Sequence, residues 1–150
     1  KENAMLTHEW PANEYAIGSY IQATVAEEYL SRIIFKPQDN VLDIGCGDGS
    51  FSIKILDKIP HGHLLGIDRS ENMLELARKK IKNYPHFSVK NMDLLDINFT
   101  EKFDYVVSFW CLQWCLDLEK AFSNIYRALK PGGKMMTLFP NGDDPFFYQS

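Results

Sequence analysis

The chain has no long apolar run and few cysteines. No apolar run reaches the length needed to span a bilayer, and the N-terminal residues lack the apolar stretch of a signal peptide, so we expect no membrane segment and no membrane partner. The three cysteines, Cys46, Cys111 and Cys115, are an odd number, which disfavours a disulfide framework and favours a reducing cytoplasm. No histidine lies near Cys111 and Cys115 in the sequence, so we predict no metal site.

Clusters of basic residues are also missing, and the formal net charge is -4 at pH 7. Nucleic-acid affinity depends on neutralising phosphates with Lys and Arg, so nucleic acid is not an expected partner. With 150 residues, 45% of them hydrophobic, the chain is long enough for one buried core. Residues 1–4, before Met5, are expected to be an expression-vector remnant or an upstream extension.

Helical and strand patterns alternate along the chain. Residues 12–35 have apolar residues at helical spacing, so we assign 1–35 to the remnant and a helical cap. Strands are predicted at residues 41–44, 64–67, 87–89, 103–109 and 134–139. Helices are predicted at residues 50–59, from the N-cap Ser70 to before Pro85, and at 118–129. This alternation predicts an α/β fold, a doubly wound, mainly parallel sheet with helices on both faces.

A glycine-rich loop, Asp43-Ile44-Gly45-Cys46-Gly47-Asp48-Gly49, follows the first predicted strand. Its glycines allow a sharp turn and a close approach of the backbone to a ligand. The third glycine falls one residue too early for the dinucleotide fingerprint, and Ser50 takes its place. Asp43 and Asp48 would repel a pyrophosphate but suit a ligand that carries an ammonium and a sulfonium. The loop therefore favours S-adenosylmethionine over a nicotinamide dinucleotide.

Acidic residues also follow the next two predicted strands. Asp68 comes a little over twenty residues after Gly45, where an acid can accept both hydroxyls of a ribose; the alternative is a solvated turn aspartate. We expect Asp93 to bind an adenine amino group, with Met92 or Leu94 against the ring. The candidate cofactor-binding residues are Tyr15, Asp43, Gly45, Cys46, Gly47, Asp48, Gly49, Asp68, Arg69, Met73, Met92, Asp93, Leu94 and Phe109.

Four segments, residues 41–49, 66–68, 103–108 and 129–133, resemble successive motifs of the class I (Rossmann-like) S-adenosylmethionine-dependent methyltransferases. The resemblance covers most of residues 38–139 and implies a cofactor-binding domain over 36–150 that releases S-adenosylhomocysteine. It also implies a seven-stranded sheet whose last two strands lie beyond the fifth. Because the sequence ends at Ser150, we expect those strands to be missing and the fifth strand to leave an edge open to a second copy of the chain.

Residues 109–114 and 124–133 are similar to a subgroup that methylates carboxylic acids: the juvenile hormone acid, trans-aconitate and malonyl-carrier-protein methyltransferases. They most resemble the juvenile hormone acid type. The resemblance implies that Trp114, and Gln22 seven residues after Tyr15, contact the acceptor carboxylate. Indole and amide N–H groups can donate to a carboxylate without burying a cation. Core packing of Trp114 and simple solvation of Gln22 are the alternatives.

An ionised carboxylate needs no general base, so Gln22 and Trp114 are the candidate catalytic residues through positioning, and the faces of Tyr15 or Phe109 would favour the cation. The Asn/Asp-Pro-Pro-aromatic element of the enzymes that methylate nucleobases is missing after the fourth predicted strand. Methylation of nitrogen, carbon or a phenol stays open, with His8 as the candidate base. A non-catalytic cofactor-binding module and a nicotinamide-dependent oxidoreductase are the rivals from other classes.

Overall fold

The computed structural model describes residues 23–109, 111–112, 115–138 and 146–149. The chain consists of two compact units, residues 1–33 and 34–150. In the first unit residues 23–30 form a helix, and Arg32 pairs with Glu28 one turn away at 2.9 Å. The predicted helical pattern continues to residue 35, but residues 31–35 are not helical, so the helix ends earlier than predicted. The part of the predicted cap before residue 23 lies outside the described residues. Within the described ranges, no helix has the length and apolar character needed to cross a membrane.

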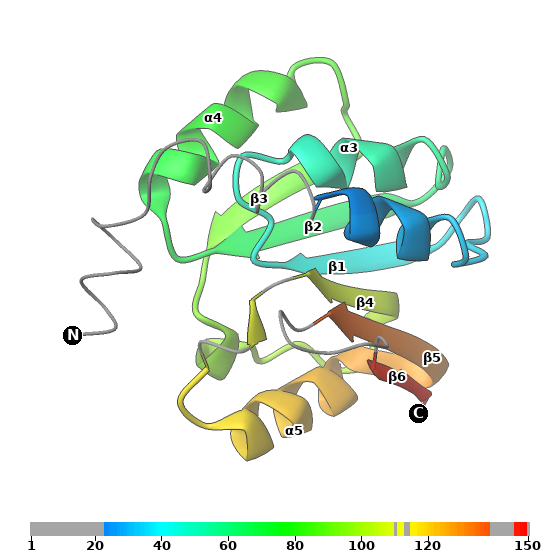
Figure 1. The fold of residues 1–150 in the computed structure, drawn as a ribbon, viewed down its shortest axis with the longest axis vertical. Helices are drawn as coiled ribbons and strands as arrows, with labels where there is room; N and C mark the ends of the chain where they lie inside the picture. The colour runs from blue at the N-terminus through cyan, green and yellow to red at the C-terminus, as the bar shows by residue number, and fades with distance from the viewer. Residues whose placement is uncertain (1–22, 110, 113–114, 139–145, 150) are drawn as a thin grey trace. The chain divides into compact units, whose positions relative to one another are not determined.

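The second unit is built on a sheet with the strand order β3-β2-β1-β4-β5-β6 (Figure 1). Its strands are β1 (Asn40–Ile44), β2 (His63–Asp68), β3 (Phe87–Asn91), β4 (Phe103–Phe109), β5 (Leu129–Leu138) and β6 (Phe146–Gln149). β1 to β5 run parallel, and β6 runs antiparallel to β5. The strand order reverses direction at β1 and β4. Ligands of open α/β sheets bind beyond the carboxyl ends of the strands at such a switch point.

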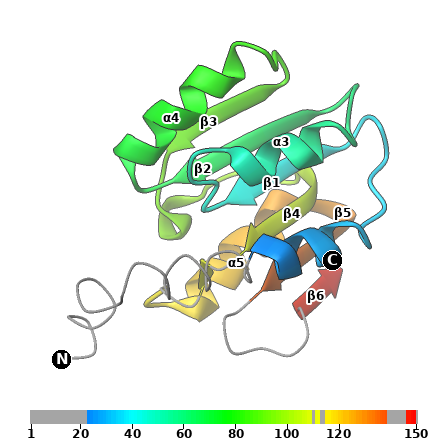
Figure 2. The ribbon, with the colours of Figure 1, turned by 45° about the horizontal axis from the view of Figure 1, so that its top comes forward.

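Helices cover both faces of this sheet, as the sequence predicts. They are α3 (Ser50–Leu56), α4 (Glu71–Ile81) and α5 (Leu118–Ala128), with a short 3-10 helix η2 (Leu94–Asp96) after β3. α3 and α4 lie on one face and α5 lies on the other (Figure 2). η2 packs against α5. The predicted N-cap is confirmed, because the Oγ of Ser70 accepts a hydrogen bond from the backbone N–H of Met73 at 3.3 Å.

The core forms where strands buried on both faces meet these helices. Val41 and Leu42 in β1 and Val106 and Val107 in β4 are all fully buried. This explains why the two segments contain adjacent apolar residues and no alternation of apolar and polar residues, as is typical of central parallel strands. One cluster joins Leu42 and Val106 to the inner side of α5 through Ile125. The predicted doubly wound fold is therefore confirmed.

The C-terminal part of the sheet corrects two expectations. β5 begins at Leu129, earlier than the predicted start at Lys134 and on the other side of Gly132 and Gly133, and a sixth strand follows it. β6 pairs with Lys134 to Thr137 of β5, so the edge that we expected to be open to a second copy is covered. The sequence of β6, Phe-Phe-Tyr-Gln, is rich in aromatic residues, which favour strands. Its four residues are too few to show an alternating pattern, which is why the sequence analysis missed it.

Candidate cofactor-binding site

A cavity of about 530 Å³ opens at the carboxyl ends of β1 and β2. Sites for small molecules and cofactors typically have volumes of roughly 300–1,000 Å³. Its lining comes from four strand ends and the segments that follow them: Ile44, Gly45, Ile67, Asp68, Arg69, Ser70, Met92, Asp93, Leu94, Leu95, Cys111, Cys115 and Leu116. One part of the wall is apolar, and Asp68, Arg69, Ser70 and Asp93 make the other part polar. The sheet therefore places the cavity at the predicted switch point.

The glycine-rich loop between β1 and α3 forms part of this wall. Gly45, Gly47 and Gly49 have φ angles of 75°, 58° and 82°, a conformation that residues with a side chain rarely adopt. The backbone N–H groups of Gly45 and Cys46 both donate to the carbonyl of Ile67, at 2.8 and 3.0 Å. Gly45 lines the cavity, whereas the Cys46 side chain packs against Gly66 in β2. The loop thus turns tightly over the end of β2.

Asp68 is held by two backbone amides at the end of β2. Its Oδ2 accepts the N–H of Gly47 at 2.8 Å, and its Oδ1 accepts the N–H of Ser70, also at 2.8 Å. A carboxylate oxygen has two acceptor sites, so each of the two oxygens keeps one for a ligand. Asp68 lines the cavity. The carboxylate is therefore fixed in position and remains able to accept two neighbouring hydroxyls.

The residues that follow β3 approach Asp68 from the neighbouring strand. The backbone N–H of Met92 donates to the carbonyl of Asp68 at 3.1 Å, which joins the two strand ends. Asp93 caps η2, because its Oδ1 accepts the N–H of Leu95 at 2.9 Å. Its other oxygen lies 3.6 Å from Nε of the exposed Arg69. Met92, Asp93, Leu94 and Arg69 all line the cavity, so the structure brings this predicted group together with Asp68.

Two carboxylates that were predicted to bind the cofactor, Asp43 and Asp48, do not line the cavity. Asp43 is 3% exposed, and its Oδ2 accepts a hydrogen bond from Oγ of Ser52 at 2.7 Å. Burial raises the pKa of Asp43 to about 7; the bond from Ser52 opposes this rise, and the charge of Asp68 adds to it. The Asp43 side chain therefore joins β1 to α3 beneath the loop, and its contact with a cofactor stays a prediction.

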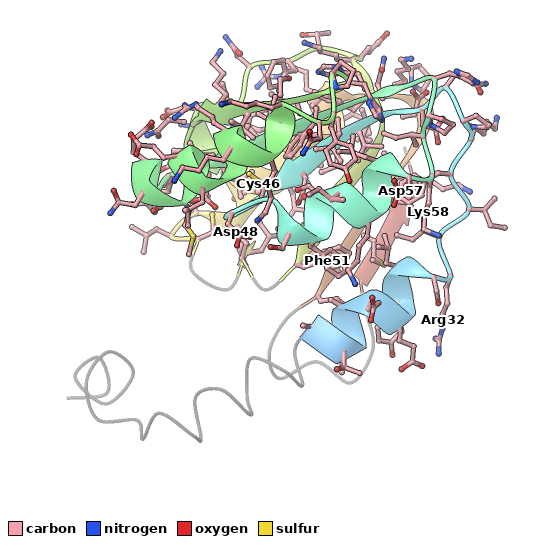
Figure 3. All side chains as sticks on the ribbon, turned by 90° about the horizontal axis from the view of Figure 1, so that it is seen from above. Arg32, Cys46, Asp48, Phe51, Asp57 and Lys58 are labelled. Carbon is pink, nitrogen blue, oxygen red and sulfur yellow. The ribbon has the colours of Figure 1, made fainter. Side chains whose placement is uncertain are left out.

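Asp48 lies in the loop just before α3 (Figure 3). Lys80 of α4 pairs with its carboxylate. The Nζ of Lys80 is 3.4 Å from Oδ2 of Asp48, and Oδ1 of Asp48 accepts the N–H of Ser50 at 2.9 Å. Partial burial raises the pKa of Asp48, but the hydrogen bonds from Ser50 and the charge of Lys80 outweigh it, so the pKa is lowered. Asp48 already has a cation as its partner, and its contact with a cofactor also stays a prediction.

Other predicted site residues are placed beside the cavity or outside the described residues. Phe109 packs edge-to-face against Phe51 of α3, with ring centroids 4.8 Å apart, and neither ring lines the cavity. Met73 is 44% exposed on α4. The predicted roles of Tyr15, Gln22 and Trp114 fall on residues outside the described ranges, and the roles of Phe109 and Met73 stay predictions.

The wall formed after β4 contains residues that were not predicted from the sequence. Cys111, Cys115 and Leu116 line the cavity, and the Leu116 side chain is 97% exposed. The signal for these residues was the rule already used for Asp68 and Asp93, that residues just after a parallel strand reach the ligand. After β4 the aromatic residues are the more prominent signal in the sequence, and the cysteines and Leu116 between and beyond them were not predicted to reach the ligand.

Comparison with known proteins decides the family. The methyltransferase domain family matches residues 41–133 of the chain. The chain belongs to this family. Phosphoethanolamine N-methyltransferase 2 of Caenorhabditis elegans is 42% identical over 112 residues, which cover 72% of the chain and 25% of the relative. Juvenile hormone acid O-methyltransferase of Bombyx mori is 35% identical over 127 residues, which cover 81% of the chain and 45% of the relative.

The solved structures agree with this assignment. Phosphoethanolamine N-methyltransferase 2 of Haemonchus contortus, in complex with S-adenosyl-L-methionine, matches this methyltransferase domain with a TM-score of 0.65 and 36% identity, covering 69% of the chain and 24% of that protein. The prediction of a Rossmann-like methyltransferase is therefore confirmed. The chain spans between a quarter and about half of the length of the curated relatives it matches.

Proposed function

We propose that this domain binds S-adenosylmethionine in the cavity at the ends of β1 and β2 and transfers its methyl group to a small molecule, at a carboxylate oxygen. The observation that carries the cofactor assignment is the Asp68 carboxylate, fixed by Gly47 and Ser70 on the cavity wall with one acceptor site left on each oxygen. A ribose has two neighbouring hydroxyls that match such an acceptor pair.

The other lining residues fit the remainder of the cofactor. Asp93 would accept the adenine amino group, and Met92 and Leu94 would contact the faces of the ring. The missing side chain of Gly45 lets Cys111 pack against the loop to complete this part of the wall, because a β-carbon on Gly45 would run into Cys111. When bound, S-adenosylmethionine supplies an electrophilic methyl group on a sulfonium. The chain binds and orients this group and excludes water from it.

A carboxylate acceptor is supported by the names of several relatives. Besides the juvenile hormone acid enzyme, trans-aconitate 2-methyltransferase of Acidovorax ebreus is 29% identical over 137 residues, covering 91% of the chain and 52% of the relative. Malonyl-[acyl-carrier protein] O-methyltransferase 1 of Ilyobacter polytropus is 35% identical over 100 residues, covering 67% of the chain and 37% of the relative. Gln22 and Trp114 would donate hydrogen bonds to this carboxylate, and no general base is needed.

N-methylation is the second candidate, because the relatives of C. elegans and H. contortus are phosphoethanolamine N-methyltransferases. The pH dependence of turnover separates the two reactions. A carboxylic acid is ionised well below neutral pH, so its methylation rate should be flat from about pH 6 to 9, whereas an amine must lose a proton and its rate should rise with pH. A flat profile with carboxylic acids supports the proposal, and turnover of amines alone contradicts it.

The acceptor residues are tested by Gln22→Ala and Trp114→Ala. Each should lower turnover of the carboxylic acid while leaving the affinity for S-adenosylhomocysteine nearly unchanged, since these side chains are proposed to touch the acceptor alone. Equal loss of turnover and cofactor affinity would refute the assignment. Cofactor binding without turnover of any acceptor would instead support the non-catalytic module.

The proposed setting is the cytoplasm, and the proposed partner is the small acceptor, without nucleic acid or membrane. The described cysteines, Cys46, Cys111 and Cys115, are free thiols, as a reducing compartment requires. Self-association through the edge of β5 lost its basis once β6 was found to pair there. Light scattering that gives the mass of one chain would agree with this.

A further inference from the structure

We infer that Lys80 is a positioning residue of the cofactor site, which holds the glycine-rich loop from α4; the inference rests on the proposed function. The Nζ of Lys80 donates to the carbonyl of Asp48 at 3.0 Å and to Oγ of Ser50 at 3.1 Å. It also pairs with the Asp48 carboxylate at 3.4 Å. One ammonium group thus contacts three oxygens on both sides of Gly49, using all the donors that a lysine has.

The loop also packs closely on the same helix. A β-carbon built on Gly49 would lie 3.4 Å from Cβ of Ala77 and 3.2 Å from the ring of Phe87. Ala77 and Lys80 are three residues apart on α4, so they lie on one side of the helix. Gly49 provides the close fit and Lys80 provides the polar anchor. Two independent contacts therefore make α4 the support of the loop.

The anchor acts at the end of the loop where α3 begins. Gly49 is the N-cap of α3, adopts φ 82°, and can offer no side chain to cap the helix. On the cavity side the loop is held by the bond from Gly47 to Asp68. Lys80 holds the opposite end of the same turn. Since Asp68 is the proposed ribose ligand, a displacement of the loop would change the geometry of the ligand itself.

The expected effect of losing Lys80 follows from the fraction of chains whose loop is in the binding conformation. The apparent dissociation constant equals the intrinsic constant divided by that fraction. The loss of one ion pair and two hydrogen bonds, all partly exposed, reduces the fraction to on the order of one tenth. Cofactor affinity should therefore fall roughly ten-fold, with only a small change in the melting temperature.

The test compares Lys80→Met with Lys79→Met, which removes the same charge from the exposed neighbouring position on α4. Titration with S-adenosylhomocysteine should show roughly ten-fold weaker binding for Lys80→Met and less than two-fold change for Lys79→Met. Lys80→Arg, which keeps the charge and the donors, should recover part of the loss. Equal affinities of Lys80→Met and Lys79→Met would overturn the inference.

Hydrogen exchange separates positioning from a general loss of stability. The amide of Gly49, bonded to the carbonyl of Cys46, and that of Ile53, bonded to the carbonyl of Gly49, should exchange faster in Lys80→Met. Amides of β1 should be unchanged. Unchanged exchange at Gly49, or faster exchange throughout the sheet, would contradict the inference. Absence of S-adenosylhomocysteine binding to the unmodified chain would overturn the proposed function instead, so the two failures are distinguishable.

Discussion

Gly45 and Cys111 lie so close together that a β-carbon on Gly45 would be 2.8 Å from Sγ of Cys111. The loop after β1 and the segment after β4 therefore meet at the cavity, although Gly45 and Cys111 are 66 positions apart in the sequence. The absence of a side chain at Gly45 is what lets the two segments approach.

Gly45→Ala should disrupt both the loop and the cavity. The substitution places a side chain at φ 75°, and it also forces Cys111 to move. Gly132→Ala is the matched control, because Gly132 has φ 83° but no atom within 4 Å of a β-carbon. Denaturant unfolding should show a loss of about 1–2 kcal/mol for Gly132→Ala and a larger loss for Gly45→Ala. Equal losses would show that the contact with Cys111 is relieved without cost.

The buried Asp43 should make stability depend on pH. Its pKa is about 7 in the folded chain against 3.8 as the ordinary value, so between about pH 4 and 7 the unfolded chain has lost a proton that the folded chain keeps. The free energy of unfolding therefore falls as pH rises through this window, by at most about 1.4 kcal/mol per pH unit. Asp43→Asn, which cannot ionise, should gain stability relative to the original chain from pH 4 to 7 and then level off.

Denaturant unfolding of Asp43→Asn and of the original chain at several pH values measures this difference in the free energy of unfolding. Ser52→Ala is the useful companion, because the hydrogen bond from Ser52 favours the charged Asp43 and its loss should extend the fall beyond pH 7. A stability difference between Asp43→Asn and the original chain that does not change with pH would show that Asp43 is ionised when buried.

The three thiols should react at different rates in the folded chain. Burial raises the pKa of Cys46 far above its usual range and also raises the pKa of Cys111, which leaves little reactive thiolate. Cys111 and Cys115 line the cavity, so S-adenosylhomocysteine should slow their alkylation by iodoacetamide. Cys46 should be the slowest with or without the ligand. Mass spectrometry of the alkylated peptides measures each rate, and faster reaction of Cys46 than of Cys111 would contradict the described packing.

The sequence predicted the sheet well where its strands are buried on both faces. The segment of β4 was predicted with its observed bounds, Phe103 to Phe109. A short run of mostly buried apolar residues in an α/β chain usually forms a central parallel strand. β6 was missed because a strand of four residues, paired on one side, gives no periodic signal. The short η2 was missed because its cap, Asp93, was interpreted only as a ligand.

The sequence predicted only part of the candidate site, namely the residues whose position follows from the order of the strands. Asp68 and Asp93 line the cavity as expected, since the position of a residue after a parallel strand is fixed by topology. Asp43 and Asp48 do not, because their orientation depends on side-chain partners in other elements: Ser52 of α3 for Asp43 and Lys80 of α4 for Asp48. A one-dimensional motif cannot show which carboxylates already have partners within the fold.

The most direct test of the account is titration calorimetry with S-adenosylhomocysteine on the original chain, Asp68→Ala and Asp57→Ala. Asp57 is exposed at the opposite end of α3 from Asp48 and serves as the control for the loss of one carboxylate (Figure 3). The account predicts saturable binding to the original chain and to Asp57→Ala, and at least roughly ten-fold weaker binding to a folded Asp68→Ala, since bonds to a charged acceptor are lost. Binding of equal strength to Asp68→Ala, or no binding to the folded original chain, would contradict it.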